Sequence, residues 1–378
     1  MMETPPDDTA SSPAPRPRLL LHIGQPKTGT TALQRALHAA RQHLLDQHGI
    51  YYPVLSSRGT HTRLKPHLLN ALDEDARLVH QMGGTHAEAM AESARAWDRI
   101  GTDIQKIRPD QVIISSESLY KPLDDGQIAR LRGLLDPWFR EVQVVVYLRD
   151  PVSRFISGAQ QRLKIRAEFS RGSGSALREV IESFEKLGYP LDVRSFDTAR
   201  THPNGVVADF AESYLPDTAR DVVIAEDTRA SHAGRTVNSS LSAEAMYLMQ
   251  NLARARAAIG APLDGDAPLT SRRRAIKELD QEIPGFTRPV LRPAIAEILM
   301  RRDRSLTWVR DRYGITFDRI DYDLVGTAPD DGLDPMGEIR DVQQICEVDL
   351  ARAALIERAI PRKRLTRRWR RLLRGHWR

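Results

Sequence analysis

The strongest constraint on the fold is a short segment near the start of the chain, where an apolar run breaks into a glycine-containing turn. The run spans residues 19–23, and Gly24-Gln25-Pro26-Lys27-Thr28-Gly29-Thr30-Thr31 follows it directly. Such a run indicates a buried strand, and the residues after Gly29 are suited to begin a helix. A strand, a turn and a helix in this order direct backbone N–H groups and the positive end of the helix dipole at one point. The segment therefore predicts a site for an anionic group, to which Lys27 adds a full positive charge.

The two glycines of this segment fit the spacing of a nucleoside-triphosphate loop, but its lysine does not. That loop has the pattern G-x-x-x-x-G-K-[ST], which Gly24 and Gly29 satisfy. Position 30 is threonine, and Lys27 lies earlier, inside the turn. No later strand end offers a clear acidic ligand for Mg²⁺, which disfavours a kinase or an ATPase. A nucleotide kinase and an ordinary strand-to-helix turn stay open as alternatives.

A second apolar run, residues 142–148, leads directly into Arg149-Asp150-Pro151. Pro151 suits the first turn of a helix, and Asp150 suits its cap. Ser157 follows Arg149 by eight residues, two turns into that helix. A guanidinium at a strand end and a hydroxyl in the next helix can hold a second phosphate. Two anion sites at the carboxyl ends of two strands predict a nucleotide with two separate phosphate positions.

Together the two motifs resemble those of sulfotransferases. The segment from Gln25 to Thr31 is similar to their 5′-phosphosulfate loop, commonly P-K-[ST]-G-[ST]-[ST], and Arg149 with Ser157 matches their 3′-phosphate motif in spacing. The resemblance covers residues 19 to about 158, and a weaker likeness to bacterial carbohydrate sulfotransferases continues at 192–197 and 235–242. It implies the donor 3′-phosphoadenosine 5′-phosphosulfate, the product adenosine 3′,5′-bisphosphate and no required metal.

The resemblance also implies roles for individual residues. Lys27 would neutralise charge on the bridging oxygen of the donor, while Arg149 and Ser157 would hold its 3′-phosphate. A loop containing Arg235 and Asn238 would cover the donor. The residues implied for the 5′-phosphate site are Gln25, Pro26, Lys27, Thr28, Gly29, Thr30 and Thr31.

A general base must take the proton of the acceptor, and the sequence offers Glu117 first. Residues 111–116 read as a third buried strand, and Glu117 follows it at the edge where both anion sites are expected. The alternatives for Glu117 are a helix cap or an ion pair with Lys27 or Arg149. The rival bases are His61 and His67, in a polar stretch over residues 58–67 that would form part of the acceptor cleft. The basic residues of this stretch suit an anionic or sugar acceptor, or form a solvated surface: Arg58, Arg63 and Lys65.

Strands alternating with helices predict an α/β fold with a doubly wound parallel sheet, of the P-loop-like sulfotransferase type. The expected helices cover about 30–48, 87–107, 152–166, 175–187, 206–214 and 242–258, with a short strand near 50–52. A helical C-terminal part begins at about residue 240. The expected organisation is a disordered segment at 1–16, one sulfotransferase domain over 17–358 and a basic tail at 359–378.

Composition fits an intracellular enzyme. The chain has 378 residues, of which 41% are hydrophobic, enough to fill a large core. Cys346 is its one cysteine, so neither an internal disulfide nor a cysteine metal site is expected, and this thiol is expected to be inert. The first residues carry no secretory pattern, and we expect a cytoplasmic location, where the sulfate donor is made.

The C-terminal tail carries the whole basic excess of the chain. Nine of residues 362–378 are Arg or Lys and none is acidic, so subtracting nine charges from the net +6 leaves −3. Trp369 and neighbouring leucines fall near helical spacing, which favours an amphipathic helix on the inner face of the cytoplasmic membrane. A nucleic-acid tail, which the interleaved Trp and Leu disfavour, and a plain solvated terminus are the alternatives.

The sequence therefore predicts a sulfotransferase that acts on a hydroxyl of a carbohydrate or glycolipid. A nucleotide kinase and a non-catalytic relative that binds glycans or membranes are the competing hypotheses. The joint presence of Lys27, Glu117, Arg149 and Ser157 argues against the non-catalytic one. The identity of the acceptor and the oligomeric state do not follow from the sequence.

Overall fold

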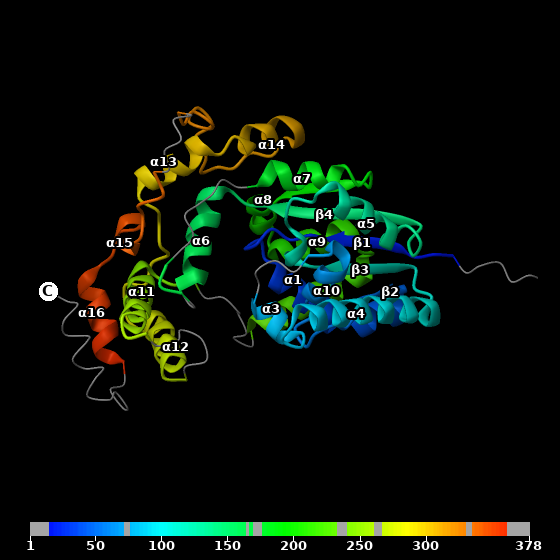
Figure 1. Ribbon diagram of the computed structural model, residues 1–378, viewed down its shortest axis with the longest axis horizontal. Coiled ribbons are helices and arrows are strands. Elements are labelled where there is room, and N and C mark those ends of the chain that lie inside the picture. Colours follow the sequence, from blue (N-terminus) through cyan, green and yellow to red (C-terminus); the bar gives the residue numbers. More distant parts are fainter. Residues whose placement is uncertain are drawn as a thin grey trace, which may run out of the picture. The chain divides into compact units, whose positions relative to one another are not determined.

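The computed structural model describes residues 15–71, 76–163, 166–168, 176–232, 240–260, 267–329 and 335–360. They fall into two compact units (Figure 1). The first unit takes its residues from Met1–Leu148 and Glu179–Arg235, and the second from Arg149–Arg178 and Thr236–Arg378. The boundaries of a single domain over 17–358 stay a prediction beside this division.

A five-stranded, all-parallel sheet forms the centre of the first unit, which confirms the predicted α/β class. Its strand order is β2-β3-β1-β4-β5, so β1 lies in the middle with β3 and β4 as neighbours. Leu19 and Leu21 on one face of β1 and Leu20 on the other are all buried, so both faces of the sheet are covered. The narrower prediction of a P-loop-like type stays a prediction. The strands are β1 (Arg18–His22), β2 (Ile50–Tyr51), β3 (Gln111–Ser115), β4 (Glu141–Leu148) and β5 (Leu191–Ser195).

Helix α1 (Thr30–His48) begins at the turn that follows β1 and has the bounds that the sequence predicts. It packs with α9 (Gly205–Tyr214) and α10 (Asp217–His232) over the core face that includes Leu20, where Leu33, Leu37 and Phe210 are buried. The remaining helices that belong wholly or partly to this unit are η1 (Thr62–Leu64), α2 (Lys65–Leu69), α3 (Ala76–Gln81), α4 (His86–Ile107), η2 (Glu117–Leu119), α5 (Asp125–Leu135), α7 (Leu177–Glu185), which begins in the second unit, and α8 (Phe196–Thr201).

The described part of the second unit is helical, as the sequence predicts for the C-terminal region. Its core joins α6 to the later helices through side chains such as Leu163, Met246 and Leu299. A single antiparallel bridge pairs Leu291 with Cys346. The helices are α6 (Pro151–Leu163), α11 (Ala243–Ala257), α12 (Ala267–Glu282), α13 (Pro293–Arg302), α14 (Ser305–Tyr313), α15 (Val342–Ile345) and α16 (Leu350–Ala359).

A buried arginine ties three of these helices together. Arg352 of α16 is 5% exposed, and its Nη1 donates to Asp280 at 2.9 Å and to Glu244 at 3.1 Å. The same guanidinium donates to the Ser242 hydroxyl and to the main-chain oxygens of Asp280, Pro284 and Ile283. A buried charge with this many partners stabilises the packing only while all of them are present.

Candidate anion-binding site

The turn after β1 is closed by its own backbone and carries one residue in a strained conformation. Both the N–H and the hydroxyl of Thr28 donate to the carbonyl oxygen of Gln25, at 3.3 and 2.7 Å. Lys27 has a φ of 77°, in the left-handed region that residues with a side chain rarely adopt. Such a residue costs on the order of 1–3 kcal/mol and is typical of ligand-binding turns. The turn is therefore held in a shape that stability alone does not explain.

Close approach explains both glycines of the turn. A Cβ atom on Gly24 would lie far inside van der Waals contact with the hydroxyl oxygen of Thr30. Gly29 has a φ of 77°, and a Cβ there would lie 2.5 Å from Cγ1 of Val206. The backbone of the turn thus runs directly against the first turn of α1 and against α9.

The N-terminus of α1 has the features of an anion site. Gly29 is its N-cap, and among the described residues no side chain caps the helix and no acidic residue lies in its first turn. Thr30 is 2% exposed, and its hydroxyl has no hydrogen-bond partner in the described part of the chain. The first N–H groups of a helix have no partner within the helix itself. An anion held here would meet those groups and the positive end of the dipole of a 19-residue helix.

Glu117 lies close enough to Lys27 for the two charges to interact. It is the first residue of η2, directly after β3, and burial raises the pKa of its carboxyl group. The positive charge of Lys27 offsets part of that rise. A second link joins the same elements, because Nε2 of Gln25 donates to the hydroxyl of Tyr120 at 3.3 Å. The positive charge of the turn thus acts on a carboxyl of raised pKa, and the role of Glu117 as a base stays a prediction.

The cap alternative for Glu117 does not hold. Ser116 occupies the N-cap position of η2, and Glu117 follows it. The alternative of an ion pair with Lys27 stays open, because the charge of Lys27 acts on the Glu117 carboxyl.

His61 is committed to a structural role. Its Nδ1 accepts from the N–H of Ser115 at 2.9 Å, and its Nε2 donates to the carbonyl oxygen of Pro53 at 2.8 Å. The ring is fully buried, which lowers its pKa to about 4. With both nitrogens engaged, this ring has no atom left to take a proton from an acceptor.

His67 lies on α2, and its contacts are to α4 and α5. Its backbone N–H donates to the Ser93 hydroxyl at 2.9 Å, and Nδ1 faces Nη2 of Arg130 at 3.4 Å. Burial and the charge of Arg130 lower the pKa of this imidazole below its ordinary value. The role of His67 as a base stays a prediction.

The residues predicted for the 3′-phosphate lie in the second unit, whereas Lys27 and Glu117 lie in the first. Arg149 follows Leu148, the last residue of β4, and Ser157 is half-buried on α6. The predicted cap is confirmed, because the N–H of Ser153 donates to Oδ1 of Asp150 at 2.7 Å. Arg235 and Asn238 lie outside the described residues.

Polar residues inside the strands are the part of the site that sequence reasoning missed. His22 and Ser115, each the last residue of its strand, are buried and joined by a hydrogen bond of 2.8 Å. Gln34 of α1 also donates to Ser115. The available signal was a polar residue inside an otherwise apolar run, at His22 and again at Ser115.

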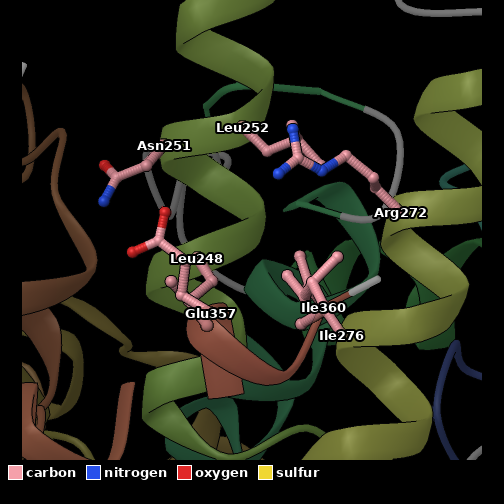
Figure 2. Close-up of a pocket in the computed structure, with 7 residues that line it drawn as sticks. All are labelled: Leu248, Asn251, Leu252, Arg272, Ile276, Glu357 and Ile360. Carbon is pink, nitrogen blue, oxygen red and sulfur yellow. The ribbon is translucent and has the colours of Figure 1, made fainter. Parts of the chain in front are cut away.

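A separate pocket lies wholly within the second unit, among α11, α12 and α16 (Figure 2). It contains none of the residues predicted for the site. Arg272 and Glu357 line it with opposite charges, and burial of the Glu357 carboxyl raises its pKa while Arg272 offsets part of the rise. Apolar side chains form most of the remaining wall, and the full lining is Leu248, Asn251, Leu252, Arg272, Ile276, Glu357 and Ile360.

Among the helices that the structure describes, none combines the length and the hydropathy needed to cross a bilayer.

Comparison with known proteins gives one distant similarity. No family model and no curated protein matches the sequence. Among solved structures, the chain is similar to a sulfotransferase domain from the curacin biosynthetic pathway, with a TM-score of 0.30 and 13% sequence identity. The similarity covers 54% of this chain and 76% of that domain. A likeness this distant assigns no activity, so any function must come from the residues themselves.

Proposed function

We propose that this chain is a sulfotransferase, which moves a sulfuryl group from 3′-phosphoadenosine 5′-phosphosulfate to a hydroxyl of a carbohydrate or glycolipid. The observation that carries the proposal is the uncapped N-terminus of α1, which follows the turn of Lys27, together with the action of the Lys27 charge on the Glu117 carboxyl. A cation, a set of helix N–H groups and a carboxyl of raised pKa are the three groups that an in-line transfer between two oxygens requires.

Each group has a separate task in the transfer. The N–H groups and hydroxyls of Thr30 and Thr31 hold the 5′-phosphate, which positions the sulfuryl group for attack, while Thr28 closes the turn through Gln25. Lys27 neutralises the negative charge that develops on the bridging oxygen as the bond to sulfur breaks. Glu117 accepts the proton of the attacking hydroxyl, and its raised pKa brings it nearer to the working pH than an ordinary glutamate.

The remaining assignments rest on sequence motifs. Arg149 and Ser157 hold the 3′-phosphate, Arg235 and Asn238 cover the donor, and His67 is the rival base. The basic tail at 362–378 docks on an anionic membrane surface, which would bring a cytoplasmic enzyme to a lipid-linked acceptor. Transfer by this scheme needs no metal ion.

The test is calorimetric titration of the purified full-length protein with adenosine 3′,5′-bisphosphate and, separately, with ATP and Mg²⁺. We expect the bisphosphate to bind and ATP to bind at least about tenfold more weakly, a difference of about 1.4 kcal/mol. Arg149→Ala should abolish bisphosphate binding. Arg274→Ala is the matched control, because Arg274 is exposed on α12 of the same unit and pairs with Glu278.

Two results would overturn the proposal. Tight binding of ATP without binding of the bisphosphate would favour the kinase suggested by the spacing of Gly24 and Gly29. Equal loss of binding in Arg149→Ala and Arg274→Ala would mean that a general effect of charge, and not a phosphate site, holds the nucleotide.

A further inference from the structure

Two buried polar residues join the strand ends from which the proposed site is built. His22 ends β1 and Ser115 ends β3, and they lie opposite each other in the sheet register. Nδ1 of His22 lies 2.8 Å from Oγ of Ser115, and both side chains are almost fully buried. The backbone repeats the link, because the N–H of Ser116 donates to the carbonyl oxygen of His22 at 2.9 Å.

The neighbours of Ser115 favour an arrangement in which its hydroxyl donates to His22. Nε2 of Gln34 donates to Oγ of Ser115 at 3.3 Å and to its carbonyl oxygen at 3.0 Å. The serine oxygen therefore accepts from Gln34, and its own hydrogen is free to point at Nδ1 of His22. His22 is then a neutral ring with its proton on Nε2, in agreement with burial that lowers its pKa to about 4.

The same serine also ties in the two other parts of the first unit that meet here. Its N–H donates to His61, which holds Pro53 on the opposite side of its ring. Gln34 belongs to α1, the helix that starts at the Lys27 turn. Ser115 is thus one point at which β1, β3, α1 and the segment after β2 are held together.

Stability alone does not account for His22. Its Nε2 is buried and has no hydrogen-bond partner in the described part of the chain. Tyr147 and Phe210 pack beside the ring, with centroids 6.0 and 5.8 Å away, so an apolar side chain would suit the space. A half-satisfied buried imidazole costs free energy that an apolar residue would not.

We propose that His22 is a positioning residue, which acts through Ser115 to hold the Lys27 turn at a set distance from Glu117. One residue separates His22 from Gly24, where the turn begins, and one residue separates Ser115 from Glu117. A change at this hydrogen bond is therefore transmitted to both reacting groups. The role given to His22 rests on the proposed function, whereas the hydrogen bond between His22 and Ser115 is independent of it.

The test measures the titration of Glu117 directly. Protein with ¹³C-labelled glutamate carboxyls is titrated by NMR, and Glu117→Gln assigns the Glu117 signal. In His22→Leu we expect the pKa of Glu117 to rise by about 0.5 unit or more, because Lys27 no longer stands at the set distance to favour the carboxylate. His22→Asn, which can still accept from Ser115, should restore the wild-type value, and the urea midpoint of His22→Leu should lie at or above that of the wild type.

Two further variants keep the test decisive. Ser115→Ala removes only the hydroxyl and should reproduce the shift even if His22→Leu fails to fold. Tyr147→Phe is the control, since it removes a buried hydrogen bond to Asp209 beside the His22 ring without touching Ser115, and it should leave Glu117 unchanged. An unchanged Glu117 titration in folded His22→Leu and Ser115→Ala would overturn the inference.

The titration and the nucleotide experiment fail separately. If the wild type does not bind adenosine 3′,5′-bisphosphate, the proposed function fails, and the Glu117 titration still decides whether His22 positions that carboxyl. If the wild type binds, His22→Leu should weaken the binding threefold to tenfold and His22→Asn should recover it.

Discussion

Gly24 must be glycine because of its neighbour and not because of its own backbone. A methyl group there would collide with the hydroxyl of Thr30. Overpacking of this kind costs typically about 1–3 kcal/mol, so Gly24→Ala should destabilise the first unit and displace the N-terminus of α1. We expect bisphosphate affinity to fall at least tenfold by calorimetry and the midpoint of urea unfolding to fall with it.

Gly133→Ala is the matched control for this change. Gly133 lies inside α5, is exposed, and has open space where a Cβ would stand. Alanine there should stabilise the protein by about 0.5–1 kcal/mol and leave nucleotide affinity unchanged. Unchanged binding in Gly24→Ala would contradict the close approach on which the anion site depends.

Glu117 gives a second prediction, in which a substitution lowers the rate of transfer without weakening nucleotide binding. Glu117→Gln removes a negative charge next to Lys27, so bisphosphate should bind as tightly as to the wild type or more tightly. Transfer of labelled sulfuryl to a panel of carbohydrate acceptors should fall about 10²- to 10⁴-fold, the usual contribution of a general base. Wild-type transfer should be lost as the pH falls through a pKa above that of an ordinary glutamate, since the base works only when ionised. Full activity of Glu117→Gln would transfer the role to another residue, with His67 as the first candidate.

Sequence predicted the chemistry of these residues better than their conformation. Two strand ends at one edge of a parallel sheet predict that Glu117 lies near the turn of Lys27, and the charge of Lys27 does act on this carboxyl, while the catalytic role of the pair stays a prediction. The left-handed backbone of Lys27 could not be predicted, because nothing in a lysine favours that conformation and only the surrounding turn imposes it. The role of His61 could not be predicted either, since both of its partners are backbone groups, one of them on β3, fifty-four positions away.

Among the elements, those with a clear apolar pattern were predicted and those without one were missed. Helix α1 runs over Thr30–His48 as predicted, with Gly49 as its C-cap. Helix α10 was not predicted, because its fully buried residues are Ala219 and Val223, and its other apolar residues cluster at Val222 and Ile224 instead of continuing along the helix. Helix α5 did carry a signal, the capping box formed by Asp124 and Gln127.

Helix α16 is attached to the second unit through Arg352 and through the buried side chains of Ala353 and Ile356, which yields a third prediction. Arg352→Met would leave the buried carboxylates of Asp280 and Glu244 without their cation, and breaking such a network costs about 3–5 kcal/mol. Arg358→Met, at an exposed position of the same helix, should change stability by less than about 0.5 kcal/mol.

The reactivity of the buried Cys346 thiol can be used to measure how the Arg352 substitution affects the second unit. Cys346 lies in the same unit, and burial raises the pKa of its thiol to about 12, so it should react with Ellman's reagent only when the unit opens. The urea concentration at which the thiol reacts should drop in Arg352→Met and stay at the wild-type value in Arg358→Met. Rapid reaction of the native wild type would contradict the burial of Cys346.

The charge of the whole molecule divides between the tail and the rest. Residues 362–378 carry nine positive charges, and the remainder of the chain has a net charge of −3. We expect the full chain to sediment with vesicles of anionic phosphatidylglycerol at low salt, and a chain ending at residue 361 to stay in solution. Each basic residue near such a surface contributes about 1 kcal/mol, so binding should weaken steeply with added salt. If the shortened chain sediments with the vesicles as well as the full chain does, the basic tail is not what binds the membrane.

The route of the chain through its two units has a consequence for synthesis on the ribosome. The chain leaves the first unit after Leu148, returns after Arg178 and leaves again after Arg235. Helix α6 therefore emerges before α11 and α13, on which its apolar side chains Val152, Phe155 and Ile156 come to rest. At roughly 5–20 residues per second, the roughly 80 residues between α6 and α11 leave these side chains exposed for about 4–16 s. During this period the nascent protein exposes an apolar helix that is covered in the folded molecule, and chaperones can bind it before α11 and α13 are made.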